Sequence, residues 1–576
     1  MAVDITVKIA GEAGQGIQTV GDFLSLVCQK SGLYLMGIND FESRIRGGYS
    51  FFQLRISDQP VYAPCPEVDL LVALNQKCYD AYHRELTKEG LAMIDIQGEP
   101  IANQAAIPID ALAAKAGGKI ASNTVAAGAC LGLLGAPIQI LEGILTDRFQ
   151  SKPGNVLSMN LSAARSGFDH VRDIRFFKKF EWKMESSKGA LIDGSRAIAL
   201  GALAGDCRVA TFYPMSPATG IMTHLVSLAD EFPIVVEQAE DEIAAVNMVV
   251  GASFAGARAM TSTSGGGFCL MTEGLGLAAI TETPIVIVNA QRPGPATGLP
   301  TRTAQGDLMF VIHASQDEFP RFVLAPGTPV EAFEITKRAF HLSDKYQVPV
   351  IILTDQTLND SVYISEKPLV APQNIERFIV NDSQMESPSE YRRFAVSESG
   401  ISPRALPCNG KALVIATGNE HREDGHTSEA DSDRIIMMNK RNAKWPAMLS
   451  EMNAPETDHE ESDILLVGWG SSKGAIQESA DLLRKQGMSV GCVHMTDLWP
   501  FPEEAVKKIL EKCSRFFVVE QNSTAQLGKL IRGQTGIAHD GAILKYDGRP
   551  FFPNEIVEGV KKHLSMEKDH GNHSRL

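Results

Sequence analysis

The stretch RAMTSTSGGGFCLMTEGLGLA, residues 258–278, decides the fold. It opens as a buried strand, turns at Ser264 and the three glycines that follow, and continues as a helix. Strand, glycine turn and helix form the repeating unit of α/β proteins. Four more strands are predicted around it, and all are continuous apolar runs rather than alternating ones, which is typical of a parallel sheet covered on both faces. They lie at residues 208–214, 232–238, 283–292 and 348–355.

Two further α/β units flank this one. Near the N-terminus, the strand 5–10 leads into the glycine turn GEAGQG and a helix at 17–27. Near the C-terminus, residues 463–487 again spell strand, glycine turn and amphipathic helix. We therefore predict an α/β protein with three parallel-sheet domains. The predicted parts are a first domain at 1–180, a second at 190–365, a polar connecting excursion at 366–460, a third domain at 461–565 and a polar tail at 566–576.

The composition of the chain limits the classes of partner that it is expected to bind. The 576 residues carry a net charge of −15, which argues against a nucleic-acid backbone or an anionic membrane as the main partner. No apolar run is long enough to predict a transmembrane helix, and the N-terminus lacks the basic start of a signal peptide. Nine scattered cysteines without a CxxC pair suit a reduced, cytoplasmic protein and predict no zinc or iron–sulfur site on this chain.

The glycine turn GEAGQG at residues 11–16 has two interpretations. Glycines let backbone amides approach an anion at a helix N-terminus, which suits a phosphate, but the same pattern also makes a plain tight turn. Arg44 and Arg46 could complete an anion pocket or lie on a turn between strands. Because Glu12 would repel a phosphate, it should point away from such a pocket or pair with a nearby Arg or Lys.

Three acids in a row follow the strand at 232–238. Glu242 opens a helix in which Ala245 and Val249 lie on the same face and Gly251 follows. This spacing resembles the pyrimidine-domain helix of thiamine diphosphate enzymes, in which one glutamate bonds the N1′ atom of the cofactor. The alternative is that Glu240, Asp241 and Glu242 merely complement the helix dipole. The SGGG turn after the next strand resembles the TSGPG-like turn of the same domain.

Two stiff loops complete the candidate site. In FYPMSPATGIM, residues 212–222, Ser216 and Thr219 offer hydroxyls within a loop that prolines rigidify. In the loop 289–308, Arg292 leaves the end of a strand, where it could bind a carboxylate through two parallel hydrogen bonds. The alternatives are an ordinary βα loop and a surface arginine.

Together these motifs resemble the 2-oxoacid:ferredoxin oxidoreductase family, and in particular its long α subunit, in which a γ domain precedes the α part. The resemblance covers about residues 10–565. The segments that carry it are GEAGQG, SRIRGGYS (43–50), YPMSPAT (213–219), QRPGPATGLPT (291–301), GNEHREDGH (418–426), DILLVGWGSSKG (463–474) and VVEQNSTAQLGKL (518–530). Within this family Ser216 stands where Thr is more common, and Glu12 and Ala13 replace glycines.

The resemblance implies a Rossmann-like γ domain, a thiamine diphosphate pyrimidine-type domain and a transketolase C-terminal-like domain. It implies that a 2-oxoacid, coenzyme A and oxidised ferredoxin give acyl-CoA, CO₂ and reduced ferredoxin. It also implies site residues: Glu242 as the acid–base group on the pyrimidine, Arg292, Ser216 and Thr219 on the substrate, Tyr213 and Pro214 on the pyrimidine side, and Gly14, Gln15, Gly16 and Arg46 on coenzyme A.

Two absences imply a partner. The sequence has no GDG segment to bind Mg²⁺ and diphosphate, and its cysteines cannot hold a cluster locally. The resemblance therefore implies a β subunit that carries Mg²⁺, the diphosphate site and a 4Fe-4S cluster, in an (αβ)₂ heterotetramer that reduces ferredoxin. The fused arrangement favours 2-oxoglutarate, with pyruvate or a broad 2-oxoacid range as the alternative. A non-catalytic scaffold with the same fold also remains open, whereas the missing GDG disfavours a self-sufficient decarboxylase.

Overall fold

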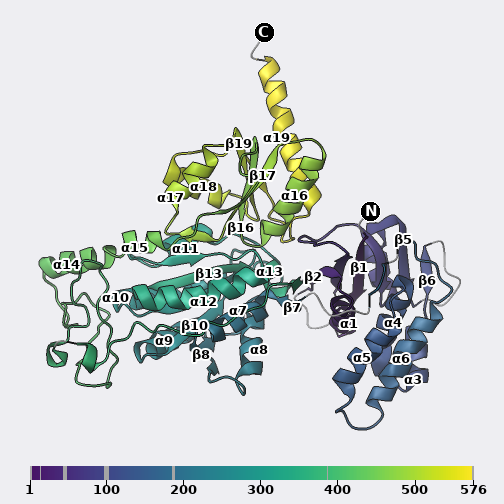
Figure 1. The fold of residues 1–576 in the computed structure, drawn as a ribbon, viewed down its shortest axis with the longest axis horizontal. Helices are drawn as coiled ribbons and strands as arrows, with labels where there is room; N and C mark the ends of the chain where they lie inside the picture. The colour runs from purple at the N-terminus through teal and green to yellow at the C-terminus, as the bar shows by residue number, and fades with distance from the viewer. Residues whose placement is uncertain are drawn as a thin grey trace. The chain divides into compact units, whose positions relative to one another are not determined.

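The computed structural model describes residues 3–12, 14–42, 48–95, 103–178, 180–183, 189–385 and 387–573, without the side chains of 388 and 566–573. The chain forms two compact units (Figure 1). Unit 1 consists of Met1–Asp193 with Asp360–Pro368, and unit 2 of Gly194–Asn359 with Leu369–Leu576. No helix among the described residues combines the length and the apolar character that crossing a membrane requires.

Unit 1 is built on an eight-stranded sheet in the order β6-β5-β4-β1-β3-β2-β14-β7. Figure 1 shows helices α3 to α6 gathered below it. The strands are β1 (Asp4–Gly11), β2 (Tyr34–Asp40), β3 (Ser50–Ser57), β4 (Val68–Ala73), β5 (Leu86–Ile94), β6 (Gln104–Ala106), β7 (Ala190–Asp193) and β14 (Val362–Ser365). The helices are α1 (Ile17–Lys30), α2 (Gln76–Tyr82), α3 (Ile109–Ala116), α4 (Ser122–Leu134), α5 (Ile138–Phe149) and α6 (Val156–His170), with 3-10 turns η1 (His83–Glu85) and η2 (Lys119–Ala121).

The sheet of unit 1 is mixed, whereas the sequence predicted a parallel one. Strand β3 pairs antiparallel with both β1 and β2, and only the half formed by β1, β4, β5 and β6 is parallel. The connection between β2 and β3 explains the difference. Only residues 41–49 join these two neighbours, and a link that short allows an antiparallel hairpin but no parallel crossover.

Strands β7 and β14 lie at the two ends of the segment that the sequence analysis assigned to the second domain. In the structure they pair with each other, with Val362 opposite Asp193, and β14 also pairs with β2 of unit 1. Residues 190–193 and 360–365 therefore belong to unit 1, and the first part of unit 2 is an insertion between two adjacent strands. Strands of four residues are too short to give a clear periodic signal.

Unit 2 contains two sheets. The first has the order β18-β12-β13-β11-β10-β8-β9 and is parallel except at β18, and every strand predicted for it from sequence is present. Its strands are β8 (Cys207–Phe212), β9 (Val235–Gln238), β10 (Arg258–Thr263), β11 (Ile285–Gln291), β12 (Phe322–Leu324), β13 (Pro349–Asp355) and β18 (Asp497–Trp499). Its helices are α7 (Gly194–Ala204), α8 (Thr219–Leu228), α9 (Glu242–Phe254), α10 (Gly265–Ile280), α11 (Leu308–His313), α12 (Pro329–Tyr346) and α13 (Gln356–Asp360).

The second sheet of unit 2 has the order β15-β17-β16-β19-β20 and shares a hydrophobic core with the first. Val323 and Ala325 of the first sheet region and Leu465 and Trp469 of the second belong to this core. The strands are β15 (Glu456–Asp458), β16 (Ile464–Trp469), β17 (Val490–Met495), β19 (Arg515–Glu520) and β20 (Gly541–Leu544). The helices are α16 (Lys473–Lys485), α17 (Glu503–Leu510), α18 (Gln526–Thr535) and α19 (Pro553–His573), and the 3-10 turn η5 spans Gly470–Ser472.

The polar excursion 366–460 packs onto unit 2. It contains η3 (Asp382–Gln384), η4 (Pro388–Glu390), α14 (Asp431–Asn442) and α15 (Trp445–Ser450). The sequence predicted this stretch as a polar connection, yet His421 within it is fully buried, with its Nε2 atom 3.1 Å from the carbonyl oxygen of Ile280. Polar composition misleads here because the polar groups of this segment find their partners inside the unit.

Buried ion pairs hold this excursion in place. The carboxylate of Glu282 accepts hydrogen bonds of 2.6 Å from both Lys440 and Lys444, and all three side chains are at least 99% buried. Burial alone would raise the pKa of Glu282, but the two ammonium groups outweigh it and hold the pKa well below its usual range.

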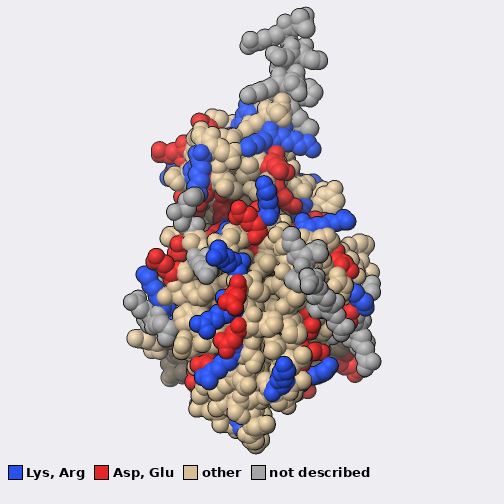
Figure 2. Space-filling view, turned by 90° about the vertical axis from the view of Figure 1, so that its right-hand side faces the viewer, with Lys and Arg blue, Asp and Glu red and all other residues tan. Residues whose placement is uncertain are grey.

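On the face drawn in Figure 2, the described acidic and basic side chains are interspersed, without a continuous basic stripe.

Candidate active site

The three consecutive acids before α9 have different surroundings. Glu240 is exposed. Asp241 is the N-cap of α9, and its carboxylate accepts a 2.7 Å hydrogen bond from the backbone N–H of Ala244. Glu242, the first residue of the helix, is only 3% exposed. Helix capping therefore accounts for Asp241 but gives no reason to bury Glu242.

The buried carboxyl group of Glu242 lacks a partner. Its Oε1 atom is inaccessible to solvent and makes no hydrogen bond with any described residue. Leaving a buried charged acceptor unpaired costs about 1–3 kcal/mol or more, so such groups in native proteins call for an explanation. A bound group that donates a hydrogen bond to Oε1 would explain why the protein leaves this atom unpaired.

The first turn of α10 lies between two carboxyl groups. A Cβ atom built on Gly265 would lie 2.4 Å from Oδ2 of Asp307, and one built on Gly267 would lie 2.7 Å from Oε1 of Glu242. Burial raises the pKa of Asp307, and a hydrogen bond from Asn289 opposes that shift. Negative groups on two sides make this turn a poor phosphate site despite its three glycines.

The loop after β8 meets the loop after β11. Arg292 follows the last residue of β11, and its Nη1 atom donates a 2.8 Å hydrogen bond to the backbone carbonyl of Ser216. The side-chain amide of Asn359 donates to the carbonyl of the next residue, Pro217, at 3.2 Å. The structure thus brings together Ser216 and Arg292, two residues that the sequence placed in different motifs.

Arg292 still has a donor to offer. Its Nε atom is buried and makes no hydrogen bond within the described part of the chain. Burial lowers the pKa of Arg292, and the negative charge of Glu242 opposes this shift. The two side chains therefore lie close enough for their charges to interact. With respect to the described residues, Glu242 therefore offers an unpaired acceptor and Arg292 an unpaired donor. Both residues follow the carboxyl ends of parallel strands, the usual location of ligands in such sheets.

The remaining residues predicted for this site lie in the loop after β8 or at the start of α8, which follows it. Tyr213, directly after the strand, is 38% exposed, and Pro214 is exposed as well. Ser216 is half-buried, and Thr219 opens α8. The hydroxyl of the buried Ser264, at the N-cap of α10, contacts the sulfur of Met215 in this loop instead of capping its own helix. The loops after β8 and β10 are therefore in direct contact.

Gln305 anchors the loop that begins at Arg292, and sequence reasoning did not identify it. This fully buried residue exchanges two hydrogen bonds with Gln521, of 2.8 and 2.9 Å, and donates a third, of 2.7 Å, to the carbonyl of Trp469. The second sheet of unit 2 thereby fixes the loop at the edge of the first. A polar residue in a Pro/Gly-rich loop gives no periodic signal, and the same holds for Asn359.

In unit 1, two described glycines of the turn, Gly14 and Gly16, have positive φ angles, which glycine adopts without strain. Gly16 has a φ of 73° and precedes α1 as its N-cap. The side-chain oxygen of Gln15 accepts hydrogen bonds of 2.7 Å from the backbone N–H of Glu12 and from Asn75. The carboxylate of Glu12 pairs with Lys77 at 3.1 Å, which confirms the expected cationic partner. Arg46 lies outside the described residues.

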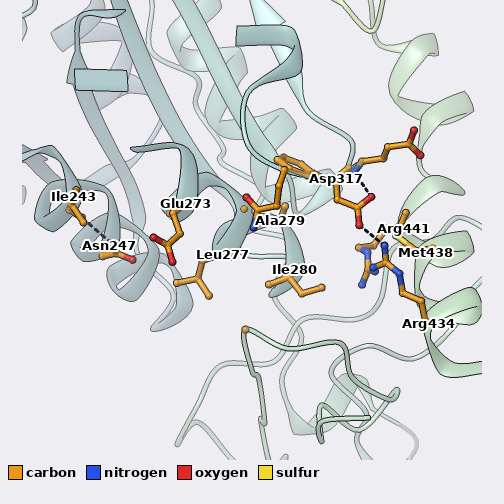
Figure 3. A pocket seen from close by; sticks show the side chains of 16 residues that line it. Ile243, Asn247, Glu273, Leu277, Ala279, Ile280, Asp317, Arg434, Met438 and Arg441 are labelled. Atoms are coloured by element: carbon orange, nitrogen blue, oxygen red, sulfur yellow. Dashed lines mark hydrogen bonds and ion pairs between the residues drawn. The ribbon is translucent and has the colours of Figure 1, made fainter. Parts of the chain in front are cut away.

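A cavity of about 440 Å³ lies elsewhere in unit 2 (Figure 3). Its walls come from α9, α10, the loop 316–319 and α14. Ile243 lines this cavity, but Glu242 and Arg292 do not. Its Arg434 is paired with Asp317 and Glu420.

Among the described residues, no cluster of His, Cys, Asp or Glu could hold a metal ion.

Three family models match successive parts of the chain. Residues 6–170 match pyruvate ferredoxin/flavodoxin oxidoreductase. Residues 200–441, which contain Glu242 and Arg292, match the thiamine diphosphate-binding model of pyruvate flavodoxin/ferredoxin oxidoreductase. Residues 462–556 match core domain II of pyruvate:ferredoxin oxidoreductase. These three ranges follow the order of the three sheets.

Relatives extend the likeness to nearly the whole chain. The 2-oxoacid:ferredoxin oxidoreductase subunit alpha of Saccharolobus solfataricus is 31% identical over 97% of each chain. The 2-oxoglutarate oxidoreductase subunit KorA of Mycobacterium tuberculosis is 27% identical over 98% of this chain and 92% of its own.

A solved structure also resembles this chain over nearly its whole length. The 2-oxoglutarate:ferredoxin oxidoreductase of Magnetococcus marinus, with 2-oxoglutarate, coenzyme A and succinyl-CoA bound, matches with a TM-score of 0.89. It is 31% identical and covers 97% of this chain and 99% of its own. With identity of this level over whole chains and a thiamine diphosphate-binding region around the candidate site, the chain belongs to the 2-oxoacid:ferredoxin oxidoreductase family and corresponds to its α subunit.

Proposed function

We propose that this chain is the α subunit of a 2-oxoglutarate:ferredoxin oxidoreductase. The reaction would convert 2-oxoglutarate and coenzyme A into succinyl-CoA and CO₂ and pass the released electrons to ferredoxin. The observation that carries the proposal is the buried Glu242, whose unpartnered Oε1 atom shares an electrostatic environment with the unpartnered Nε atom of Arg292. An acid–base group and a carboxylate-binding cation are what this chemistry needs from the protein.

The residues around Glu242 fit the pyrimidine half of thiamine diphosphate. A buried carboxylate oxygen without a partner suits a ring that presents a proton at a nitrogen atom. Glu242 would hold that proton at Oε1, and Tyr213 and Pro214 would bound the ring from the exposed side of the loop after β8. When bound, the cofactor supplies the sink for the electron pair that the loss of CO₂ releases.

The substrate would lie beside Arg292. One arm of the guanidinium is already held by the carbonyl of Ser216, at 2.8 Å, which fixes the plane of the group. The free Nε edge can then bind the 1-carboxylate of a 2-oxoacid through parallel hydrogen bonds. The hydroxyls of Ser216 and Thr219 would contact the same substrate.

A partner subunit would complete the site. The turn of α10, with carboxyl groups on two sides, does not suit a diphosphate, and the sequence contains no GDG segment. We infer that a β subunit binds the diphosphate with Mg²⁺, carries a 4Fe-4S cluster and delivers electrons to ferredoxin, in an (αβ)₂ assembly. The word "alpha" in the name of the Saccharolobus relative supports a complex of several subunits.

Coenzyme A would bind unit 1 at the glycine turn. The left-handed Gly16 places the turn at the N-terminus of α1, where the helix favours an anion, and the pairing of Glu12 with Lys77 offsets the charge of that carboxylate. The Magnetococcus structure contains coenzyme A. Gly14, Gln15 and Gly16 would contact its phosphates, and Arg46 is a further candidate from the sequence.

The first prediction concerns the substrate. Two relatives carry 2-oxoglutarate in their names, whereas the Saccharolobus protein is named for 2-oxoacids in general. With the reconstituted complex, kcat/KM for ferredoxin reduction should be at least about tenfold higher with 2-oxoglutarate than with pyruvate or 2-oxobutyrate, because a second carboxylate adds charged hydrogen bonds. Equal or higher values with pyruvate would favour a pyruvate or broad 2-oxoacid enzyme.

A second prediction tests the acid–base role. Glu242→Gln keeps the size of the side chain but cannot take up a proton, so 2-oxoacid-dependent dye reduction should fall by roughly 10² to 10⁴. The exposed Glu240, two residues earlier, provides the matched control, and Glu240→Gln should stay within about twofold of wild type. If Glu242→Gln kept more than about a third of the activity, Glu242 would not have this role.

A third prediction tests the carboxylate contact. Arg292→Lys keeps the charge but loses the planar pair of donors, so KM for the 2-oxoacid should rise about tenfold or more. The KM for coenzyme A provides the internal control and should not change, since the proposed coenzyme site lies in unit 1. An unchanged KM for the 2-oxoacid would instead make Arg292 a structural residue of the loop.

The fourth prediction tests the coenzyme site with a matched pair. A Cβ atom at Gly14 would meet nothing within 4 Å, and both Asp and Asn tolerate its positive φ better than most residues. Gly14→Asp should raise KM for coenzyme A at least about tenfold by charge repulsion, while Gly14→Asn should change it only about twofold. Equal effects of the two variants would mean that no phosphate lies near this turn.

A further inference from the structure

Gly267, the third residue of α10, lies where the helix passes closest to Glu242. A Cβ atom at Gly267 would lie 2.0 Å from Oγ1 of Thr263 and 2.7 Å from both Cγ and Oε1 of Glu242. Real Cβ atoms do not approach other heavy atoms this closely, so any larger residue forces a neighbour to move. The clash involves the middle of the Glu242 side chain as well as its tip.

A glycine at this position is otherwise unfavourable. Within a helix, glycine is about 1 kcal/mol less favourable than alanine. The preceding residue, Gly266, shows that close packing does not restrict the whole turn, because a Cβ atom there would have its nearest neighbour at 3.9 Å, the carbonyl oxygen of Ala296. Of these two adjacent glycines, only Gly267 packs too closely for a Cβ atom, against the side chains of Thr263 and Glu242.

We propose that Gly267 is a positioning residue whose missing side chain lets the carboxyl group of Glu242 lie against the first turn of α10. The inference rests on the proposed function of Glu242. With any side chain at residue 267, the carboxyl group turns away and Oε1 no longer points where a bound pyrimidine presents its proton. Gly267 touches no reacting atom and acts only through Glu242.

The test compares Gly267→Ala with Gly266→Ala in the full complex. Gly267→Ala should lower kcat about 30-fold or more with little change in KM for the 2-oxoacid, since only the acid–base group is displaced. The dissociation constant for thiamine diphosphate, measured by calorimetric titration, should rise about tenfold, as expected for the loss of one charged hydrogen bond. Gly266→Ala should remain within about twofold of wild type in both measurements.

A double-mutant cycle separates positioning from a general packing effect. In the Glu242→Gln background, Gly267→Ala should cause no further loss of kcat, because the group that it displaces no longer functions. Independent, multiplicative losses would overturn the proposal. If Gly267→Ala is unstable, the pair Thr263→Ala/Gly267→Ala removes the nearer clash and is compared with Thr263→Ala alone, with the same expected loss.

Failure of this inference differs from failure of the proposed function. If Glu242→Gln abolishes activity but Gly267→Ala behaves like Gly266→Ala, Glu242 keeps its role and Gly267 does not position it. If Glu242→Gln is active, the proposed function of Glu242 fails first, and Gly267 loses its basis with it.

Discussion

The buried, unpartnered carboxyl group of Glu242 is the constraint on which the account of this site depends. No described residue bonds Oε1, and solvent does not reach it, whereas Glu240 is exposed and Asp241 caps α9. A folded protein tolerates such an atom when a ligand completes it. The nearby α10 helix contributes by offering Gly267, which has no side chain, at the point of closest approach.

The rest of unit 2 fixes the surroundings of that carboxyl group. Parallel strands deliver the loops of Ser216 and Arg292 to one edge of the sheet, and the hydrogen bond between them joins the loops after β8 and β11, which β10 separates in the sheet. The second sheet of unit 2 holds the far end of the Arg292 loop through Gln305. The ion pairs of Glu282 with Lys440 and Lys444 attach the polar excursion to the rest of unit 2.

Sequence reasoning recovered the elements that have a strong local signal. Continuous apolar runs predicted the central strands, and the motif around Glu242 predicted its place at a helix start, because both depend on neighbours in sequence. Long-range pairing had no such signal. The hairpin that makes the first sheet mixed, the meeting of β7 with β14 and the burial of His421 depend on residues far apart in the chain. Gln305 was missed for the same reason.

The most direct test of the central claim is the binding of thiamine diphosphate, in the presence of Mg²⁺, to this chain alone and to the complex with its partner. Calorimetric titration should detect binding to the complex and none at comparable concentrations to the isolated chain, because we propose that this chain holds only the pyrimidine side. The Glu242→Gln complex should bind roughly 10- to 100-fold more weakly than wild type, as expected for a charged hydrogen bond. Equally tight binding by the isolated chain, or unchanged binding by the variant complex, would contradict a shared site centred on Glu242.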